Sequence, residues 1–178
     1  MNRQSLKKLI PMLMLIYTAS GFIGFIYEEI CVYINDGEFY KRGTTYGPWI
    51  PIYGFGCLLI YFLTVRLRKK PWLVFLVSSL SCGTLELATG FILDRFFHKR
   101  LWDYSLVILN WGNLNGYICV RSVITWGLFA LFLIYAILPP FEKLQDKHPK
   151  VFNVIAATLF ALFVTDIIIS LAVKKLAM

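Results

Sequence analysis

Four ionisable side chains lie inside otherwise apolar stretches of this sequence. They are Glu28, Glu86, Arg121 and Asp166, and Glu29 adjoins the first of them. A charge near the centre of a bilayer costs at least ~2.5 kcal/mol, so such a residue normally faces other helices or water and has a partner. A group of this kind binds a substrate, transfers a proton, or pairs with another charge to fix helix packing.

The elements that must position these charges are transmembrane helices. The chain has 178 residues and is 58% hydrophobic, whereas a soluble domain is nearer about 45–50%. The excess lies in blocks of roughly 17–25 residues, the length that crosses the hydrocarbon core of a bilayer. We predict an all-α fold, a polytopic transmembrane bundle of about five helices in a single membrane domain, with helices at residues 9–34, 49–65, 72–93, 115–138 and 151–173.

The depths of the four charges predict one cluster. Glu28, Glu86 and Asp166 precede the ends of their blocks by six or seven residues, and Arg121 follows the start of its block by six. At 1.5 Å per residue, each lies roughly 9–10 Å below the same membrane face. We expect Arg121 to bridge Glu28 and Glu86, because a guanidinium group matches carboxylates well. The alternative that stays open is an ion-pair network that only fixes helix packing.

Small residues share a helix face with both glutamates. This pattern lets helix backbones approach closely, so both glutamates are expected at helix–helix contacts and away from lipid. The two series are Ser20, Gly24 and Glu28, and Ser79, Gly83, Glu86 and Gly90.

Basic residues set the expected orientation and the class of partner. Of the 18 Lys and Arg residues, ten lie on the side of the N-terminus, and the compact turn 66–70 holds four of them. The positive-inside rule therefore predicts a cytoplasmic N-terminus. The net charge of +8 fits loops against anionic lipid headgroups, so no nucleic-acid partner is expected.

Two segments depart from the simple helical pattern. The block from Trp49 opens with Pro51 and contains Gly54 and Gly56, so its outer end is expected to be unwound or re-entrant, which is tolerated only when buried in protein or lining a cavity. Residues 101–116 mix aromatic and polar residues and look interfacial.

Motifs for several enzyme classes are absent from the sequence. It has no phosphate-binding loop, no zinc-protease motif and no serine-nucleophile elbow. The four cysteines lie in apolar blocks without metal-ligand spacing and are expected to be packing residues. We expect no cofactor and no metal site, and the enzyme class is less favoured than a non-enzymatic one.

Several strings resemble a known family in combination. They are Gly24–Glu28, the Gly-Pro-Trp-Ile-Pro-Ile-Tyr-Gly run within Arg42–Gly56, Glu86–Gly90, and Trp102–Ser105 with Asn110 beyond. The chain resembles the bacterial membrane proteins described as putative ABC-transporter type IV, the CmpB-like permeases. The resemblance covers roughly residues 20–138 and implies a permease subunit with an unspecified substrate. It carries nothing over to Asp166.

The matching positions extend the candidate site toward the external loop. Pro51 and Tyr53 are expected to enter the membrane from the face beneath which Glu28, Glu86 and Arg121 lie. Asp103 is the expected loop carboxylate, with Trp102 and Tyr104 as aromatic walls and Asn110 nearby. The alternative for residues 102–105 is the cap of a short interfacial helix.

The leading hypothesis is a transport component, permease-like or substrate-capturing, with its site in the outer half of the bundle and an unknown small-molecule or lipid substrate. The lipid bilayer is the expected surrounding, and because five helices are few for a complete pathway, we also expect a homo-oligomer or a separate ATPase subunit. The short hydrophilic loop Pro139–Lys150 offers little docking surface for an ATPase. The two alternatives are an enzyme acting on a lipid or isoprenoid headgroup, and a non-catalytic membrane assembly protein.

Overall fold

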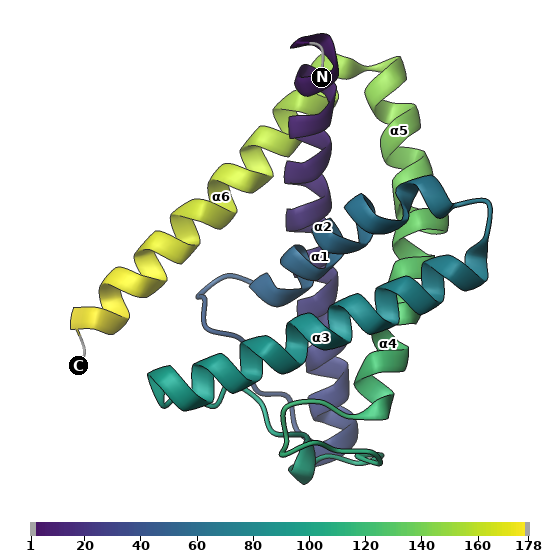
Figure 1. The fold of residues 1–178 in the computed structure, drawn as a ribbon. Helices are drawn as coiled ribbons and strands as arrows, with labels where there is room; N and C mark the ends of the chain where they lie inside the picture. Colours follow the sequence, from purple (N-terminus) through teal and green to yellow (C-terminus); the bar gives the residue numbers. More distant parts are fainter. Residues whose placement is uncertain (1–2, 177–178) are drawn as a thin grey trace. The chain divides into compact units, whose positions relative to one another are not determined.

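The computed structural model describes the backbone of residues 3–176 and the side chains of residues 6–173. The side chains of Arg3, Lys174 and Lys175, which enter the charge comparison, lie outside these residues, and the orientation stays a prediction. Within the described part the elements are the following (Figure 1): α1 (Arg3–Asp36), α2 (Pro51–Thr64), a 3-10 turn (Val65–Leu67), α3 (Pro71–Phe97), a 3-10 turn (Tyr104–Leu106), α4 (Val120–Phe132), a π-helical turn (Leu133–Ile137), α5 (Leu138–Lys147) and α6 (Pro149–Leu176).

The all-α prediction is confirmed. Within the described residues, four helical stretches are long and apolar enough to cross a membrane, namely Leu6–Asp36, Pro71–Phe97, Val120–Lys147 and Pro149–Val173. The fifth helical stretch, Pro51–Leu67, is apolar but shorter. The molecule is therefore a five-helix, multi-pass membrane protein with four long candidate spans.

The fourth predicted helix has the wrong bounds. Residues 115–119 are not helical, and the helix that begins at Val120 continues past Pro139 and Pro140 to Lys147. A proline lacks the N–H that would bond the preceding turn, and its ring crowds that turn. The π-helical turn at 133–137 ends one residue before the two prolines and widens the helix where they need room. The predicted hydrophilic loop 139–150 is consequently helical except for a break at His148.

Contacts within the chain define two compact units, which are described separately. Unit 1 comprises the residues up to Leu58 and those from Leu138 onward, and unit 2 comprises Leu59–Ile137. In unit 1, α1 packs along α6 and its first turns meet α5 (Figure 1). Lys8 pairs there with Asp146 at 3.0 Å, and the buried Gln145 donates to the Lys8 carbonyl at 2.7 Å.

Aromatic rings fill the space between α1 and α6 in unit 1. The Tyr17 ring packs edge-on against Phe163 of α6, with 4.9 Å between ring centres. Trp49, just before α2, contacts Phe22 of α1 at 6.2 Å and Phe163 at 6.0 Å. These rings bury a large apolar area at one seam.

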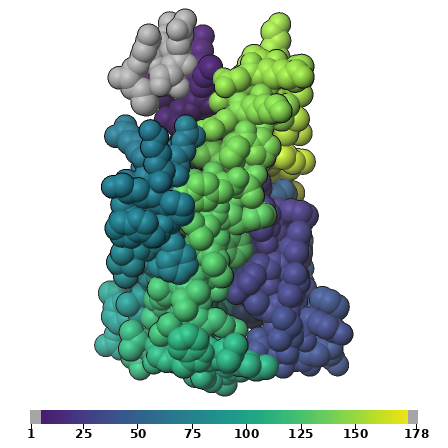
Figure 2. Space-filling model, turned by 90° about the vertical axis from the view of Figure 1, so that its right-hand side faces the viewer, coloured from purple at the N-terminus to yellow at the C-terminus, as the bar shows by residue number. Residues whose placement is uncertain are grey.

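In unit 2, α3 packs against α4 along the predicted stripe of small residues. Ser79, Gly83, Glu86 and Gly90 are all buried. A Cβ placed on Gly127 of α4 would lie 2.3 Å from the Ser79 hydroxyl, so this crossing requires glycine. The loop of residues 98–119 forms a compact cap at the N-terminal end of α4 (Figure 2).

Candidate polar site

The connecting segment, residues 37–50, runs back along α1 without helical structure. The N–H of Ile50 donates to the carbonyl of Gly21 at 3.1 Å. Gly21 is fifteen residues before the end of α1, which corresponds to about 22 Å of helix. The connecting segment therefore returns to the level of the middle of α1 before α2 begins. The unwound stretch precedes Pro51, and the prediction that Gly54 and Gly56 are unwound is wrong, because α2 includes both.

Side chains of unit 1 accept hydrogen bonds from backbone N–H groups of this segment that no helix pairs. Non-helical backbone at membrane depth is tolerated only where its polar groups find partners. The N–H of Arg42 donates to Glu29 Oε1 at 2.8 Å, and that of Gly47 donates to Asp166 Oδ1 at 2.8 Å. The N–H of Tyr46 donates to the Ser170 hydroxyl at 2.8 Å. Two acids of the candidate spans, Glu29 and Asp166, thus hold the connecting segment in place.

Glu28 forms a polar cluster with Tyr53 and Arg42 in unit 1. The Tyr53 hydroxyl donates to Glu28 Oε1 at 2.7 Å, and Arg42 Nε lies 3.7 Å from Glu28 Oε2. The Tyr53 ring crosses Gly24, where a Cβ would lie 2.2 Å from the ring. Glycine at position 24 therefore lets α2 approach α1 and brings the hydroxyl to the carboxylate.

Glu86 forms the corresponding cluster in unit 2. Its side chain is buried, with 6% exposed. Oε1 accepts from the Tyr104 hydroxyl at 2.6 Å, and Oε2 accepts from Trp126 Nε1 at 3.3 Å. Tyr104 comes from the loop and Trp126 from α4, so one carboxylate joins three elements. Hydrogen bonds to a charged group are stronger than those between neutral groups.

Arg121 differs from its predicted position. It is the second residue of α4 rather than six residues inside a helix, so the helix bounds from which its depth was predicted are wrong, and the common depth itself stays a prediction. Its guanidinium carbon lies 5.8 Å from the centre of the Tyr104 ring, a cation–π distance. In unit 2, as far as the described residues extend, Arg121 reaches Glu86 through this ring and not by an ion pair.

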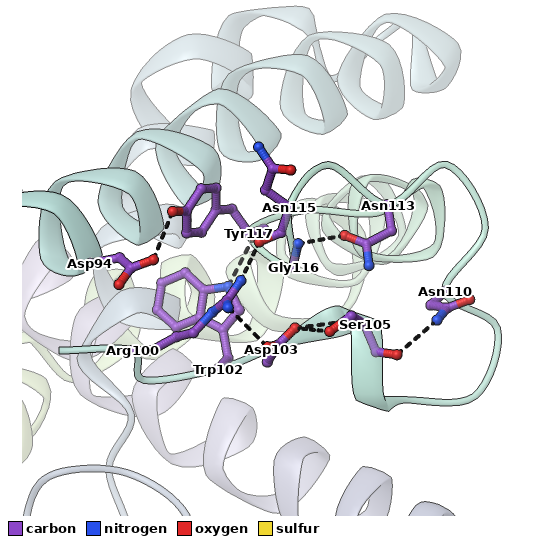
Figure 3. A network of polar contacts seen from close by, with 10 residues as sticks. All are labelled: Asp94, Arg100, Trp102, Asp103, Ser105, Asn110, Asn113, Asn115, Gly116 and Tyr117. Atoms are coloured by element: carbon purple, nitrogen blue, oxygen red, sulfur yellow. Dashed lines mark hydrogen bonds and ion pairs between the residues drawn. The ribbon is translucent and has the colours of Figure 1, made fainter. Parts of the chain in front are cut away.

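The loop of unit 2 is held by its own polar network (Figure 3). Trp102 Nε1 donates to the Tyr117 carbonyl at 2.9 Å, and the Tyr117 hydroxyl donates to Asp94 Oδ2 at 2.7 Å. That hydrogen bond raises the pKa of Tyr117 above its ordinary value of 10.0. Arg100 pairs with Asp103 at 3.1 Å and also contacts the Asn115 carbonyl.

Asp103 caps the 3-10 turn of this loop. Its Oδ1 accepts from the Ser105 N–H at 2.9 Å and from the Ser105 hydroxyl. The hydroxyl contact holds the pKa of Asp103 below its ordinary value of 3.8, and the Ser105 N–H and Arg100 act in the same direction against slight burial. Asn110 donates to the Ser105 carbonyl at 3.1 Å. The capping alternative is therefore observed, and these residues order the loop that carries Tyr104.

The structure thus joins some of the predicted site residues in each unit. Unit 1 pairs Glu28 with Tyr53, and unit 2 gathers Glu86, Tyr104 and Arg121. Sequence reasoning missed Trp126, and it noted Arg42 as part of a family string but not as a site residue. Trp126 could have been found from its place in an apolar block, because a buried indole N–H usually needs a hydrogen-bond acceptor such as a nearby carboxylate. The cluster that would join all four charges stays a prediction. In the described part, no three His, Cys, Asp or Glu residues are grouped to hold a metal ion.

The class of protein follows from these features. Long apolar helices, and carboxylates that accept hydrogen bonds from neighbouring helices and connecting segments, define a multi-pass α-helical membrane protein. The family model described as putative ABC-transporter type IV matches residues 15–171, and the chain belongs to this family. The match extends beyond the motifs noted above to include most of α6, with Asp166. No curated protein and no solved structure matches the chain significantly.

Proposed function

We propose that the chain is a transport component that captures its substrate at Glu86, in the outer half of a single membrane domain. The observation that carries this proposal is a buried carboxylate in an apolar helix with a loop hydroxyl on one oxygen. Charged residues at membrane depth commonly mark substrate pathways. Glu86 is therefore the group that we expect a substrate to engage.

The two tyrosines differ in how easily they can leave their glutamates. Tyr53 belongs to α2, is only 7% exposed, and its ring is fixed over Gly24. Tyr104 belongs to a loop and begins a 3-10 turn of three residues. A ligand can displace the loop tyrosine at a lower cost in packing, which favours Glu86 over Glu28 as the binding group.

The chemistry of the cluster limits the substrate class. A carboxylate only accepts hydrogen bonds, so a ligand that replaces Tyr104 must bring a hydrogen-bond donor, such as a hydroxyl or an ammonium group. Release of Tyr104 also frees Arg121 from the ring, and its guanidinium is then available to an anionic group of the same ligand. Trp102, Asp103 and Asn110 act in this proposal through the loop that carries Tyr104.

The transport assembly contains more than one copy of this chain or a separate ATPase subunit. A bundle of five helices leaves little room for a complete pathway, and the sequence has no phosphate-binding loop of its own. The helical α5 provides a firmer surface for a partner than a short loop would.

Replacing Glu86 tests the proposal. The Glu86→Gln protein, with Glu38→Gln as an exposed carboxylate control, is purified in detergent and its thermal unfolding is measured with a panel of primary amines, amino acids and polyols. We expect at least one compound to stabilise the wild type and the control but not Glu86→Gln, and cells carrying Glu86→Gln to lose uptake of it. A fold unchanged with lost turnover of a lipid headgroup would favour an enzyme instead. Destabilisation without any ligand effect would leave Glu86 a packing residue.

A further inference from the structure

The loop that carries Tyr104 exposes an apolar surface. Its polar side chains bond to one another within the loop, as Asp103 does with Ser105 (Figure 3). Leu106 has 83% of its surface exposed, and Leu109 has 61%. The other large apolar residues that this loop exposes are Leu101, Ile108, Trp111 and Leu114. So many apolar side chains on one short loop mark a surface that contacts a membrane or a partner protein.

The helices that flank this loop favour the bilayer as the partner of its apolar surface. α3 and the stretch that contains α4 are both candidate membrane spans. Their exposed apolar side chains continue to the loop, since Phe96 and Phe97 end α3 and Ile124 lies in the second turn of α4. The exposed Arg95 and Lys99 flank the two phenylalanines in the sequence. Aromatic and basic residues together are typical of the headgroup level of a membrane.

The Tyr104 side chain stands between two opposite charges. Its hydroxyl donates to Glu86 Oε1 at 2.6 Å, and its ring centre lies 5.8 Å from the guanidinium carbon of Arg121. A guanidinium group matches phosphate oxygens with parallel N–H donors, whereas a carboxylate accepts from a hydroxyl or an ammonium group. A ligand that carries both a phosphate and such a donor therefore engages both side chains, which a simple amine or a free phosphate does not.

We propose, on the basis of the proposed capture at Glu86, that the substrate is a phospholipid that reaches this carboxylate from the bilayer. Its headgroup ends in an ammonium or a hydroxyl group, which replaces the Tyr104 hydroxyl on Glu86. The phosphate pairs with Arg121, and the acyl chains remain against the apolar surface of the loop. Ethanolamine and glycerol headgroups both supply this chemistry, whereas a choline headgroup lacks the donor.

Native mass spectrometry of the purified protein tests the substrate class. Phosphatidylethanolamine, phosphatidylglycerol and phosphatidylcholine with the same acyl chains are added at equal concentration to the wild type, to Glu86→Gln and to the exposed control Glu38→Gln. We expect the wild type and the control to bind one of the first two lipids roughly tenfold more than phosphatidylcholine, and Glu86→Gln to lose this preference. The lipid that binds more identifies the donor as ammonium or hydroxyl. Arg121→Gln keeps the bond between Tyr104 and Glu86, should lose the same lipid, and serves if Glu86→Gln does not fold.

Deacylated headgroups separate this inference from the proposed function. Glycerophosphoethanolamine and glycerophosphoglycerol are added in the same way. If they bind as well as the lipids and still require Glu86, the substrate is water-soluble, and capture at Glu86 stands without the lipid. Equal binding of phosphatidylcholine would also overturn the inference. If no lipid, headgroup, amine or polyol distinguishes the wild type from Glu86→Gln, capture at Glu86 itself is wrong.

The position of the loop is tested without any ligand. A nitroxide label is attached to Leu106→Cys in proteoliposomes, in a chain whose half-buried Cys31 is replaced by alanine, since the other native cysteines are buried. Oxygen concentrates in hydrocarbon and a nickel chelate stays in water, so this label should relax more with oxygen. A label on Lys147→Cys, an exposed position at the end of a candidate span, should relax more with nickel. An equal nickel response at the two positions would place the loop in water, and shielding from both reagents would place a protein on it. Either result overturns entry from the bilayer.

Discussion

The approach of α2 to α1 depends on Gly24, and an alanine there should be costly. The added Cβ would lie 2.2 Å from Tyr53 Cγ and 2.6 Å from Tyr53 Cβ, whereas carbon atoms pack at about 3.5–4.0 Å. Because Tyr53 Cβ is itself too close, rotating the ring does not relieve the clash, and α2 must move. Overpacking of this kind costs about 1–3 kcal/mol. The displacement also weakens the bond from the Tyr53 hydroxyl to Glu28.

Gly21 provides the matched control in the same helix. A Cβ at Gly21 would lie 3.7 Å from the Ile50 carbonyl oxygen and 4.0 Å from the Ile50 nitrogen, which are ordinary contacts. Gly21→Ala should be neutral or gain up to about 1 kcal/mol from the helix preference of alanine. The assay is reversible denaturation in mixed micelles, read as the free energy of unfolding. Equal free energies for Gly21→Ala and Gly24→Ala would refute the close α1–α2 packing.

Two further predictions concern the loop of unit 2. Gly116 has a φ of +76°, and a Cβ added there would lie 2.2 Å from Asp103 Oδ1. Gly116→Ala should therefore cost about 1–2 kcal/mol in backbone strain and speed proteolysis within residues 98–119. An unchanged cleavage rate would contradict this geometry. The pKa of Asp103 is lowered in the folded loop. The Asp103 carboxylate therefore stabilises the loop above pH 3.8, and this stabilisation is lost as the pH falls through the lowered pKa. Protection of the wild-type loop from protease should fall over that pH range, and Asp103→Asn should remove the pH dependence.

The helical class and the helix contacts could be predicted from the sequence. Apolar block length alone indicates the spans, and spacing by three and four residues placed Glu86 and Gly90 on a buried face. The position of Arg121 could not be predicted in the same way. Residues 115–119 are largely apolar, yet Gly116 accepts from the Tyr104 N–H at 2.9 Å and Leu114 pairs with Ile118. Contacts with distant parts of the loop therefore decide where α4 begins.

The connecting segment shows a second limit. Pro51 indicated a change of backbone, but hydropathy cannot reveal that residues 37–50 run back to Gly21. From the sequence, Asp166 was assigned to a predicted charge cluster and Glu29 was only noted beside Glu28. Both acids also accept hydrogen bonds from backbone N–H groups of the connecting segment, a role that appears only once the chain is folded.

Competition between a ligand and the Tyr104 hydroxyl for Glu86 is the central claim, and one pair of variants tests it directly. The affinity of the compound that stabilises the wild type is measured for Tyr104→Phe and Glu86→Gln. Removing a competing hydrogen bond to a charged group, about 1.5–3 kcal/mol, should tighten binding to Tyr104→Phe by roughly 10–100-fold. Glu86→Gln should bind weakly or not at all. If Tyr104→Phe weakens binding as much as Glu86→Gln does, the tyrosine is part of a fixed scaffold and the displacement account is wrong.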